Sequence, residues 1–453
     1  MSVGAEPGSP PQAAEPRQRA TFIGDLRAVL AEHGFRRLFA TRLVSQAGDG
    51  VITAGVGTYV FFNASTFPSP TAGAAAFAVL YLPYSLIGPF AGVFIDRWSR
   101  RQILVWSALV RAVFVAATAA LMAAGNRGVP LYVGVLAVLA VNRFFLASLS
   151  AALPHVVAED KLVMANSVSP TVGGILSSIG GILAFGLNTV TGDTERGAAV
   201  TVLVGGGCYV GAGLVAATMS KDLLGPDREH WKGTRIFTDL AEVAAGLLAG
   251  ARYVLRQRGP RAALGATGGF SFLFGPLFLM TIILYRNYFY PSHATVAASH
   301  VAVLAAVSAV GYLCAALVTP PATRRLSKQA WITIMLCAAA VAAGLLGETF
   351  LQVAYLAVGF CLYLTRQGVA ICATTILQEG IEDVYRGRVF AFYDMMFNAT
   401  YVAGAALFAA FMPRSGKSEV IVALAAAGFA AVAAAYWLSA GRTPSASAQA
   451  SSS

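Results

Sequence analysis

The sequence predicts an all-α, polytopic membrane protein, with twelve transmembrane helices in two six-helix halves related by a pseudo-twofold (6+6) arrangement. Hydrophobic residues make up 57% of the 453 residues, and charged residues only 12%, against ~25% in ordinary soluble domains. Residues 50–95 and 287–323 contain no Asp, Glu, Lys or Arg, and each stretch exceeds the ~20 apolar residues that cross a bilayer. These observations exclude a soluble enzyme, a disordered chain and a fibrous protein.

Twelve apolar segments fit this length. Each must be a helix, because lipid cannot satisfy the backbone polar groups of an open chain. In chain order we expect the first six at residues 37–62, 73–95, 102–124, 129–152, 165–190 and 197–219. The second six are expected at 262–285, 296–319, 330–347, 350–375, 387–411 and 419–440. Turn-rich stretches such as Asn63–Gly73 and Gly125–Pro130 separate neighbouring segments.

Positive residues predict the orientation. With the N-terminus inside, 23 Lys and Arg residues fall in cytoplasmic segments, 5 in outer loops and 4 within spans. Because Lys and Arg accumulate in cytoplasmic loops, we expect both termini in the cytoplasm and the chain in the cell (plasma or inner) membrane. The net charge of +11 follows from this bias and does not indicate nucleic-acid binding, although a contact with anionic lipid stays open.

The first span carries one polar stripe, in which Arg42, Gln46, Asp49 and Thr53 recur at helical spacing. Burial disfavours the charged form of a carboxylate, so an acid inside a span can take up and release a proton. Asp49 is therefore a candidate for proton coupling, and Arg42 and Gln46 are candidates for a substrate cavity. The alternative is a structural ion pair of Asp49 with Arg42 or Arg111.

The junction of the second and third spans carries the sharpest motif, Gly92–Arg101 (GVFIDRWSRR). A basic cytoplasmic turn explains its arginines but not the aspartate beside them. The stretch resembles the signature loop of the major facilitator superfamily, GxLADRxGRR. The matching residues are Gly92, Asp96, Arg97, Arg100 and Arg101, and the departures are Phe94, Ile95 and Ser99.

In that family the signature loop latches the cytoplasmic side between the halves. The resemblance implies that Asp96 meets Arg386 and Arg388, at the start of the eleventh span, when this side is closed. Attraction between a carboxylate and the N-terminus of a helix favours the same contact.

The fourth and fifth spans carry two further resemblances. Arg143–Ala152 is similar to the family's RxxQGxGAA segment at its Arg and at its small residues. The resemblance assigns proton transfer to Arg143, with Asn142 beside it as a cavity candidate. Ser169–Gly174 and Gly180-Gly181 resemble the antiporter motif GPxxGG, and close helix packing is the alternative role for these glycines.

The linker divides the chain into domains. We expect a cytoplasmic tail at 1–35, one half at 36–220, a linker at 221–261, the other half at 262–440 and a disordered tail at 441–453. Within the linker, Arg235–Gln257 has apolar residues at helical spacing and basic residues near its end, which predicts an amphipathic helix at the cytoplasmic interface. A plain connecting helix and a regulatory helix both stay open.

The second half repeats features of the first. Arg366 follows Arg143 by 223 residues, and Glu382 follows Glu159 by the same number, which predicts a six-helix duplication. Arg366 is therefore a cavity candidate. In the eleventh span Asp394 is a candidate for proton coupling, although its nearness to the basic residues at 386 and 388 favours a structural role, and Asn398 is a cavity candidate.

The resemblance covers residues 35–440 and extends to the drug:proton antiporter and siderophore-exporter branch. It implies a secondary transporter that exports small amphiphilic molecules (a drug, siderophore or secondary metabolite) by alternating access, with an importer or uniporter as the alternative. The expected partners are a small-molecule substrate, protons and the lipid bilayer, with no cofactor, metal or nucleic acid, and the expected state is a monomer. The sequence contains no HExxH or GxSxG motif, which would indicate an enzyme, and no GxxxxGK[ST] motif, which would indicate a nucleotide-driven pump.

Overall fold

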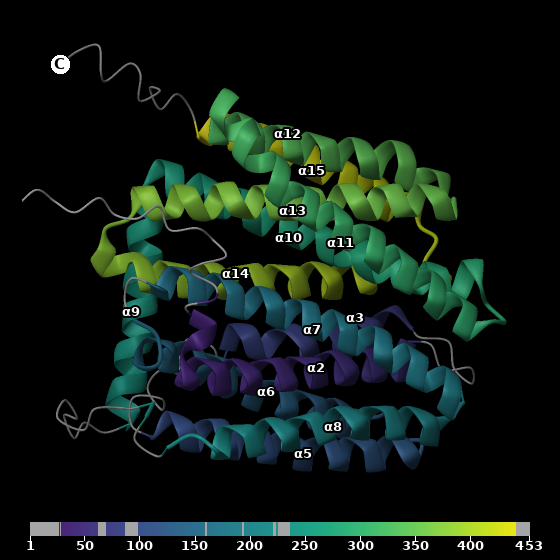
Figure 1. The fold of residues 1–453 in the computed structure, drawn as a ribbon. Coiled ribbons are helices and arrows are strands. Elements are labelled where there is room, and N and C mark those ends of the chain that lie inside the picture. The colour runs from purple at the N-terminus through teal and green to yellow at the C-terminus, as the bar shows by residue number, and fades with distance from the viewer. Residues whose placement is uncertain are drawn as a thin grey trace, which may run out of the picture.

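The computed structural model describes residues 27, 29–61, 69–86, 98–158, 161–192, 194–220, 223–224 and 236–440. Every regular element in these ranges is a helix (Figure 1). The first half contains α2 (His33–Phe61), α3 (Pro70–Leu86), α5 (Arg100–Ala123), α6 (Val129–Ala152), α7 (Leu162–Thr191) and α8 (Glu195–Ala217). After α9 (Ile236–Arg256), the second half contains α10 (Arg258–Leu284), α11 (Ala294–Arg325), α12 (Lys328–Val341), α13 (Gln352–Gly380), α14 (Asp383–Ala409) and α15 (Glu419–Ser439).

A helix therefore lies on each of the twelve segments expected to span the membrane. Nine helices in the described ranges are long and apolar enough to cross a bilayer. The three others are α2 and α14, whose N-terminal halves carry several charges, and α3, which has 17 residues in the described part. The all-helical fold is confirmed, and the count of twelve spans is consistent with it.

Polar side chains cap the first turn of several helices. Thr194, Ser327 and Ser418 each accept a hydrogen bond from the backbone N–H three residues later, at the starts of α8, α12 and α15. Such caps satisfy donors that the first turn of a helix leaves open. The helix α11 runs to Arg325, six residues past its expected end, and includes Pro320 and Pro321; the next helix begins directly after its cap, Ser327.

Glycines bring α2 and α7 into backbone contact in the first half. A Cβ atom on Gly50 would lie 1.8 Å from the carbonyl oxygen of Ser177, and one on Gly180 would lie 2.2 Å from that of Ala47. Such close approach is typical of small residues at helix interfaces in membranes. For Gly180, the packing role that the sequence left open is therefore supported by the geometry.

The same crossing recurs between α10 and α14. A Cβ atom on Gly275 would lie 2.3 Å from the carbonyl oxygen of Tyr401, and one on Gly404 would lie 1.8 Å from that of Phe272. These two glycines follow their first-half equivalents by 225 and 224 residues. The near match to the offset of 223 places equivalent crossings in the two halves.

The two halves meet mainly through α3, which packs on α14 and also contacts α10. The contact is aromatic: the ring of Phe77 stacks on Tyr401 at 5.8 Å between centroids, and Tyr81 meets Tyr401 edge-on at 4.7 Å. On the other side of the molecule, α7 faces the second half across a cavity.

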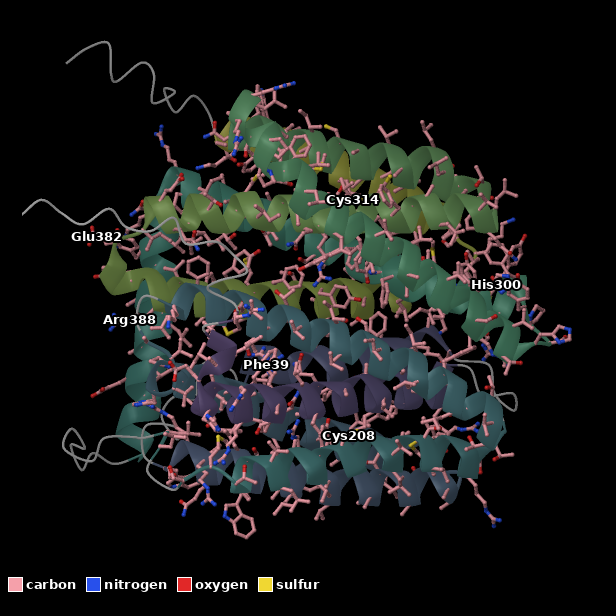
Figure 2. All side chains as sticks on the ribbon, in the orientation of Figure 1. Phe39, Cys208, His300, Cys314, Glu382 and Arg388 are labelled. Atoms are coloured by element: carbon pink, nitrogen blue, oxygen red, sulfur yellow. The ribbon has the colours of Figure 1, made fainter. Side chains whose placement is uncertain are left out.

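The helix α9 coincides with the amphipathic helix predicted at 235–257. It runs across the ends of the two halves, and Arg388 lies where it passes α14 (Figures 1 and 2). A Cβ atom on Gly250 would lie 2.9 Å from Cβ of Arg388, and Gly246 faces the guanidinium of the same residue. Tyr253 stacks on Tyr385 at 4.3 Å between centroids. The position of α9 at the membrane interface stays a prediction.

Candidate transport site

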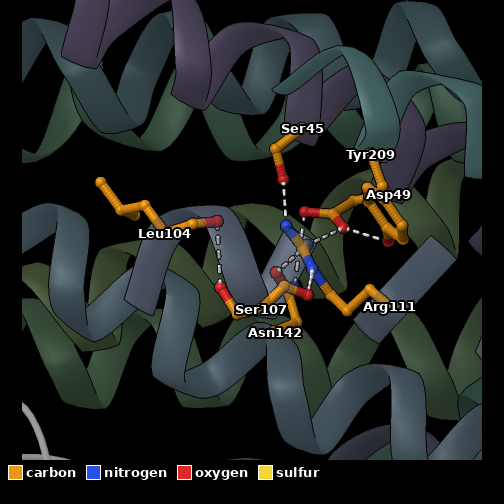
Figure 3. A network of polar contacts seen from close by, with 7 residues as sticks. All are labelled: Ser45, Asp49, Leu104, Ser107, Arg111, Asn142 and Tyr209. Carbon is orange, nitrogen blue, oxygen red and sulfur yellow. Dashed lines mark hydrogen bonds and ion pairs between the residues drawn. The ribbon is translucent and has the colours of Figure 1, made fainter. Parts of the chain in front are cut away.

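A fully buried arginine lies at the centre of the first half. Arg111 projects from α5, and its side chain is 0% exposed. It donates hydrogen bonds to Oγ of Ser45 at 2.9 Å, to Oδ1 of Asn142 at 2.6 Å and to the carbonyl oxygen of Ser107 at 3.4 Å (Figure 3). A buried charge is tolerated only when its polar groups are satisfied, and this site supplies acceptors from α2, α5 and α6.

Asp49 on α2 supplies the negative charge for this arginine. Its Oδ1 atom lies 3.4 Å from Nη1 of Arg111 and accepts a 2.6 Å hydrogen bond from the hydroxyl of Tyr209 (Figure 3). Its Oδ2 atom accepts a hydrogen bond from Nδ2 of Asn142 at 3.4 Å. Four helices, α2, α5, α6 and α8, thus meet at one carboxylate.

Two aromatic rings complete the surroundings of the guanidinium. Cζ of Arg111 lies 4.2 Å from the ring centroid of Phe145 and 4.0 Å from that of Tyr209. A desolvated guanidinium gains favourable electrostatic energy over a ring face. Tyr209 therefore contacts both members of the ion pair, through its hydroxyl and through its ring.

A cavity of about 140 Å³ adjoins the ion pair within the first half. Its lining includes Gln46, Asp49 and Thr53 of α2 together with Asn142 and Ser177. Three of the four residues in the polar stripe predicted from helical spacing therefore face one space, and Arg42 does not.

Arg42 lines a smaller neighbouring hollow with Ser169 and Pro170 of α7. Gly173 leaves room for the side chains of Gln46 and Arg42. A Cβ atom at this position would lie 2.5 Å from Oε1 of Gln46 and 3.2 Å from Nε of Arg42.

The arginine that pairs with Asp49 is Arg111, whereas the role of proton partner was assigned to Arg143. In the described part of the chain, the residues bonded to the Asp49 carboxylate are Arg111, Asn142 and Tyr209. Successive residues of a helix are rotated by ~100°, so Arg143 leaves α6 in a different direction from Asn142. The charge of Arg143 interacts electrostatically with both Asp49 and Asp394, in opposite halves.

A larger cavity of about 850 Å³ lies between the halves. One wall is α7, from Pro170 to Ser178, and the other walls are α10, α11 and α13. Arg366 of α13 lines it, as the sequence predicted for a cavity residue. Its volume is that of a typical small-molecule site.

Aromatic rings surround Arg366. Its Cζ atom lies 5.0 Å from the ring centroid of Phe397 and 5.9 Å from those of Phe274 and Tyr363. These distances fall within the range of cation–π contact.

The acid and amide predicted on α14 lie elsewhere. The residue Asp394 is exposed, and its carbonyl oxygen accepts a hydrogen bond from Nδ2 of Asn398 at 2.8 Å. Neither residue lines the two cavities described above.

The signature loop is described only in part. Gly92, Asp96 and Arg97 lie outside the described residues, as does the side chain of Arg386, so the predicted latch stays a prediction. Arg100 donates hydrogen bonds to the ring of His155 and to the carbonyl oxygen of Leu224, and Arg101 donates to that of Ala217 at 2.7 Å. These contacts connect the start of α5 to the turn after α6, to the end of α8 and to the residues that follow α8.

Sequence reasoning missed parts of both sites. Ser45 lies one helical turn before Asp49 on α2, so helical spacing could have placed it beside the ion pair, whereas Tyr209 comes from α8 and carries no such signal. Arg111 was weighed only as a structural partner. Tyr363 lies one helical turn before Arg366 on α13, but the rings of Phe274 and Phe397 come from α10 and α14, and no spacing in the sequence brings them to Arg366.

Known proteins resemble the chain along most of its length. The profile of the Major Facilitator Superfamily matches residues 38–399. An uncharacterized MFS-type transporter of Mycobacterium tuberculosis is 33% identical over 402 residues, which are 87% of this chain and 89% of the relative. A transporter of the same description from Mycobacterium bovis matches equally.

Solved structures share the fold. The nucleoside transporter NupG has a TM-score of 0.63 at 15% identity over 90% of this chain and 99% of its own. A bacterial homologue of the human lysosomal transporter Spinster, inward-facing and unoccupied, has a TM-score of 0.63 at 14% identity over 92% and 97%. A bacterial homologue of the iron transporter ferroportin, inward-facing, has a TM-score of 0.61 at 16% identity over 90% and 98%.

Proposed function

This chain belongs to the major facilitator superfamily, and we propose that it is a proton-coupled exporter of small amphiphilic molecules that works by alternating access. The observation that carries the proposal is the Asp49–Arg111 pair, which lies 3.4 Å apart beside a cavity in the first half. A carboxylate in such a place can exchange its bond to an arginine for a proton.

Protonation of Asp49 changes what holds Arg111. With the carboxylate charged, four helices are tied together through the ion pair, Asn142 and Tyr209. With the carboxylate neutral, Arg111 keeps Ser45, Ser107 and Asn142 as acceptors but loses its counter-charge. Proton uptake thus weakens the contact between α2 and α5, and the two protonation states favour different arrangements of the first half.

The substrate binds in the larger cavity between the halves, separate from the proton site. Its apolar lining and Arg366, the charged residue among the described lining residues, support a small amphiphilic ligand. A membrane potential supplies ~2.3 kcal/mol per charge per 100 mV. This free energy corresponds to a roughly fiftyfold ratio of substrate concentrations across the membrane.

The same proposal includes the setting of the protein. The distribution of Lys and Arg supports a plasma- or inner-membrane location with both termini in the cytoplasm. The presence of two halves with a cavity between them in one chain supports a monomer as the transport unit.

Everted membrane vesicles test the function. Vesicles with the wild-type protein, the Asp49→Asn variant or neither are given three probes: ethidium, Nile red and 1-anilinonaphthalene-8-sulfonate. We expect wild-type vesicles to accumulate at least one probe when a pH gradient is imposed, and nigericin to abolish the accumulation. No accumulation of any probe beyond the control vesicles would contradict an amphiphile exporter, and accumulation only in right-side-out vesicles would indicate an importer.

A further inference from the structure

The lining of the larger cavity defines the chemistry of its ligand. The side chains from α7, α10, α11 and α13 are predominantly apolar or aromatic, with a few hydroxyl groups such as those of Thr281 and Ser308. The charged residue among the described lining residues is Arg366. A ligand with many hydroxyl groups would leave most of them without hydrogen-bond partners, which is costly in an apolar site.

The charge of Arg366 is available to a ligand. In the part of the chain that the structure describes, its guanidinium forms cation–π contacts but no ion pair. A guanidinium offers a planar fork of donors that fits a carboxylate, sulfonate or phosphate. The same positive charge repels a cationic ligand.

The cavity reaches the outer surface of the bundle between α7 and α11. Ile175 of α7 and Leu313 of α11 both line it, and they are 53% and 62% exposed. Figure 1 shows these helices in different halves, whereas the packed contact between halves is made by α3. Both residues lie away from the ends of their helices, where exposed apolar side chains suit the hydrocarbon region, so we infer that the opening between α7 and α11 faces lipid.

We propose that this cavity binds amphiphiles with one anionic headgroup and one apolar body, which reach it from the bilayer between α7 and α11. The headgroup binds Arg366, and the apolar body lies along Ile175 and the facing side chains of α11. This inference rests on the proposed transport function, because it names the substrate class of that cavity.

Binding in lipid nanodiscs tests the headgroup. Radiolabelled dodecanoate is the probe, empty nanodiscs give the background, and dodecanol and dodecylammonium serve as neutral and cationic competitors with the same chain. We expect dodecanoate to bind at least about tenfold more tightly than either, as the loss of a charge-assisted hydrogen bond implies. Arg366→Gln should remove this preference, and Arg366→Lys should keep part of it. Equal competition by dodecylammonium, or unchanged dodecanoate binding to Arg366→Gln, would overturn the proposal.

Two glycines of α7 test the route. A Cβ atom on Gly174 or on Gly186 would meet no atom within 4 Å, and both residues are exposed, but only Gly174 lines the cavity. We expect Gly174→Phe to slow and weaken dodecanoate binding severalfold, and Gly186→Phe to bind as the wild type does. Equal effects of the two substitutions would overturn the lateral route.

A short-chain competitor tests whether the ligand needs an apolar body. Butyrate has the same headgroup but hardly partitions into a bilayer, so we expect it not to displace dodecanoate. Displacement by butyrate at concentrations similar to dodecanoate would overturn the need for an apolar body. These measurements need no gradient. Wild-type protein that binds dodecanoate but transports no probe under a pH gradient contradicts the proposed function alone, and proton-driven transport of a cationic probe with no dodecanoate binding contradicts this inference alone.

Discussion

The carboxylate of Asp49 lies 3.4 Å from the guanidinium of Arg111, and the two residues join α2 to α5 across 62 positions of the chain. The arginine side chain is 0% exposed and the aspartate side chain 15%. Removing two charges from water is costly unless the remaining polar atoms are satisfied. The surrounding hydroxyl and amide groups supply those hydrogen bonds. The two residues therefore form an ion pair that is lost when the Asp49 carboxylate binds a proton.

The first prediction concerns coupling. Asp49→Asn keeps the size of the side chain but cannot change its charge. We expect this variant to lose accumulation driven by a pH gradient while it keeps substrate binding and downhill exchange. The measurement compares uphill accumulation and counterflow of the same probe in proteoliposomes.

Asp394→Asn is the matched control, because Asp394 is exposed on α14 and lines neither described cavity. It should accumulate the probe nearly as well as the wild type does. If Asp49→Asn still concentrates the probe under a pH gradient and Asp394→Asn does not, the coupling carboxylate is Asp394.

The second prediction concerns the stability of the ion pair. Arg111→Met leaves the Asp49 carboxylate without its counter-charge, and breaking one side of a buried pair costs about 3–5 kcal/mol. The double variant Asp49→Asn/Arg111→Met should recover at least about 1 kcal/mol of that loss, as coupled neighbours do. Thermal unfolding of the four proteins in nanodiscs gives the coupling.

The more exposed ion pair of Arg127 and Glu195 serves as the control for this stability measurement. It has a similar separation, 3.2 Å, but its side chains are 25% and 42% exposed. Pairs of this kind contribute about 1 kcal/mol or less, so Glu195→Gln should change the unfolding temperature little. Strictly additive effects at Asp49 and Arg111 would show that their contact does not stabilise the fold.

Much of the fold follows from local properties of the sequence. Apolar length located a helix at every expected span, and helical spacing located α9 almost to the residue. Helix ends were less predictable, because α11 continues to Arg325 until the serine that caps the next helix. The glycine crossings were predicted only in part, because Gly275 and Gly404 gain meaning only once α10 and α14 lie together.

The site was predicted as far as single helices allow. The stripe of Gln46, Asp49 and Thr53 faces one cavity, as the spacing of a single helix indicates. Which arginine pairs with Asp49 depends on how α5 and α6 pack against α2, and the sequence carries no local signal for that choice. A family resemblance favoured Arg143, whereas packing placed Arg111 at the carboxylate.

The third prediction concerns the equivalent crossings of the two halves. Gly50→Ala and Gly404→Ala place a methyl group 1.8 Å from a carbonyl oxygen of the neighbouring helix. Overpacking of this kind costs about 1–3 kcal/mol, more than the gain of about 1 kcal/mol that alanine brings within a helix. Both variants should unfold at lower temperature, and Gly186→Ala, which meets no atom within 4 Å, should not. A neutral result at either crossing would contradict tight contact there.

The last prediction concerns the packing of α9 against α14. In Gly250→Leu the new side chain begins 2.9 Å from Cβ of Arg388, so α9 must move away. Leucine is a better helix former than glycine by about 1 kcal/mol, so weaker protection cannot come from poorer helix formation. We expect trypsin to cleave at Arg252 and Arg256 several times faster, because proteolysis follows the population of the open form. Gly387→Leu, beside the same arginine but in open space, should be cleaved at the wild-type rate. Equal cleavage of both variants would show that the glycine contact does not hold α9 in place.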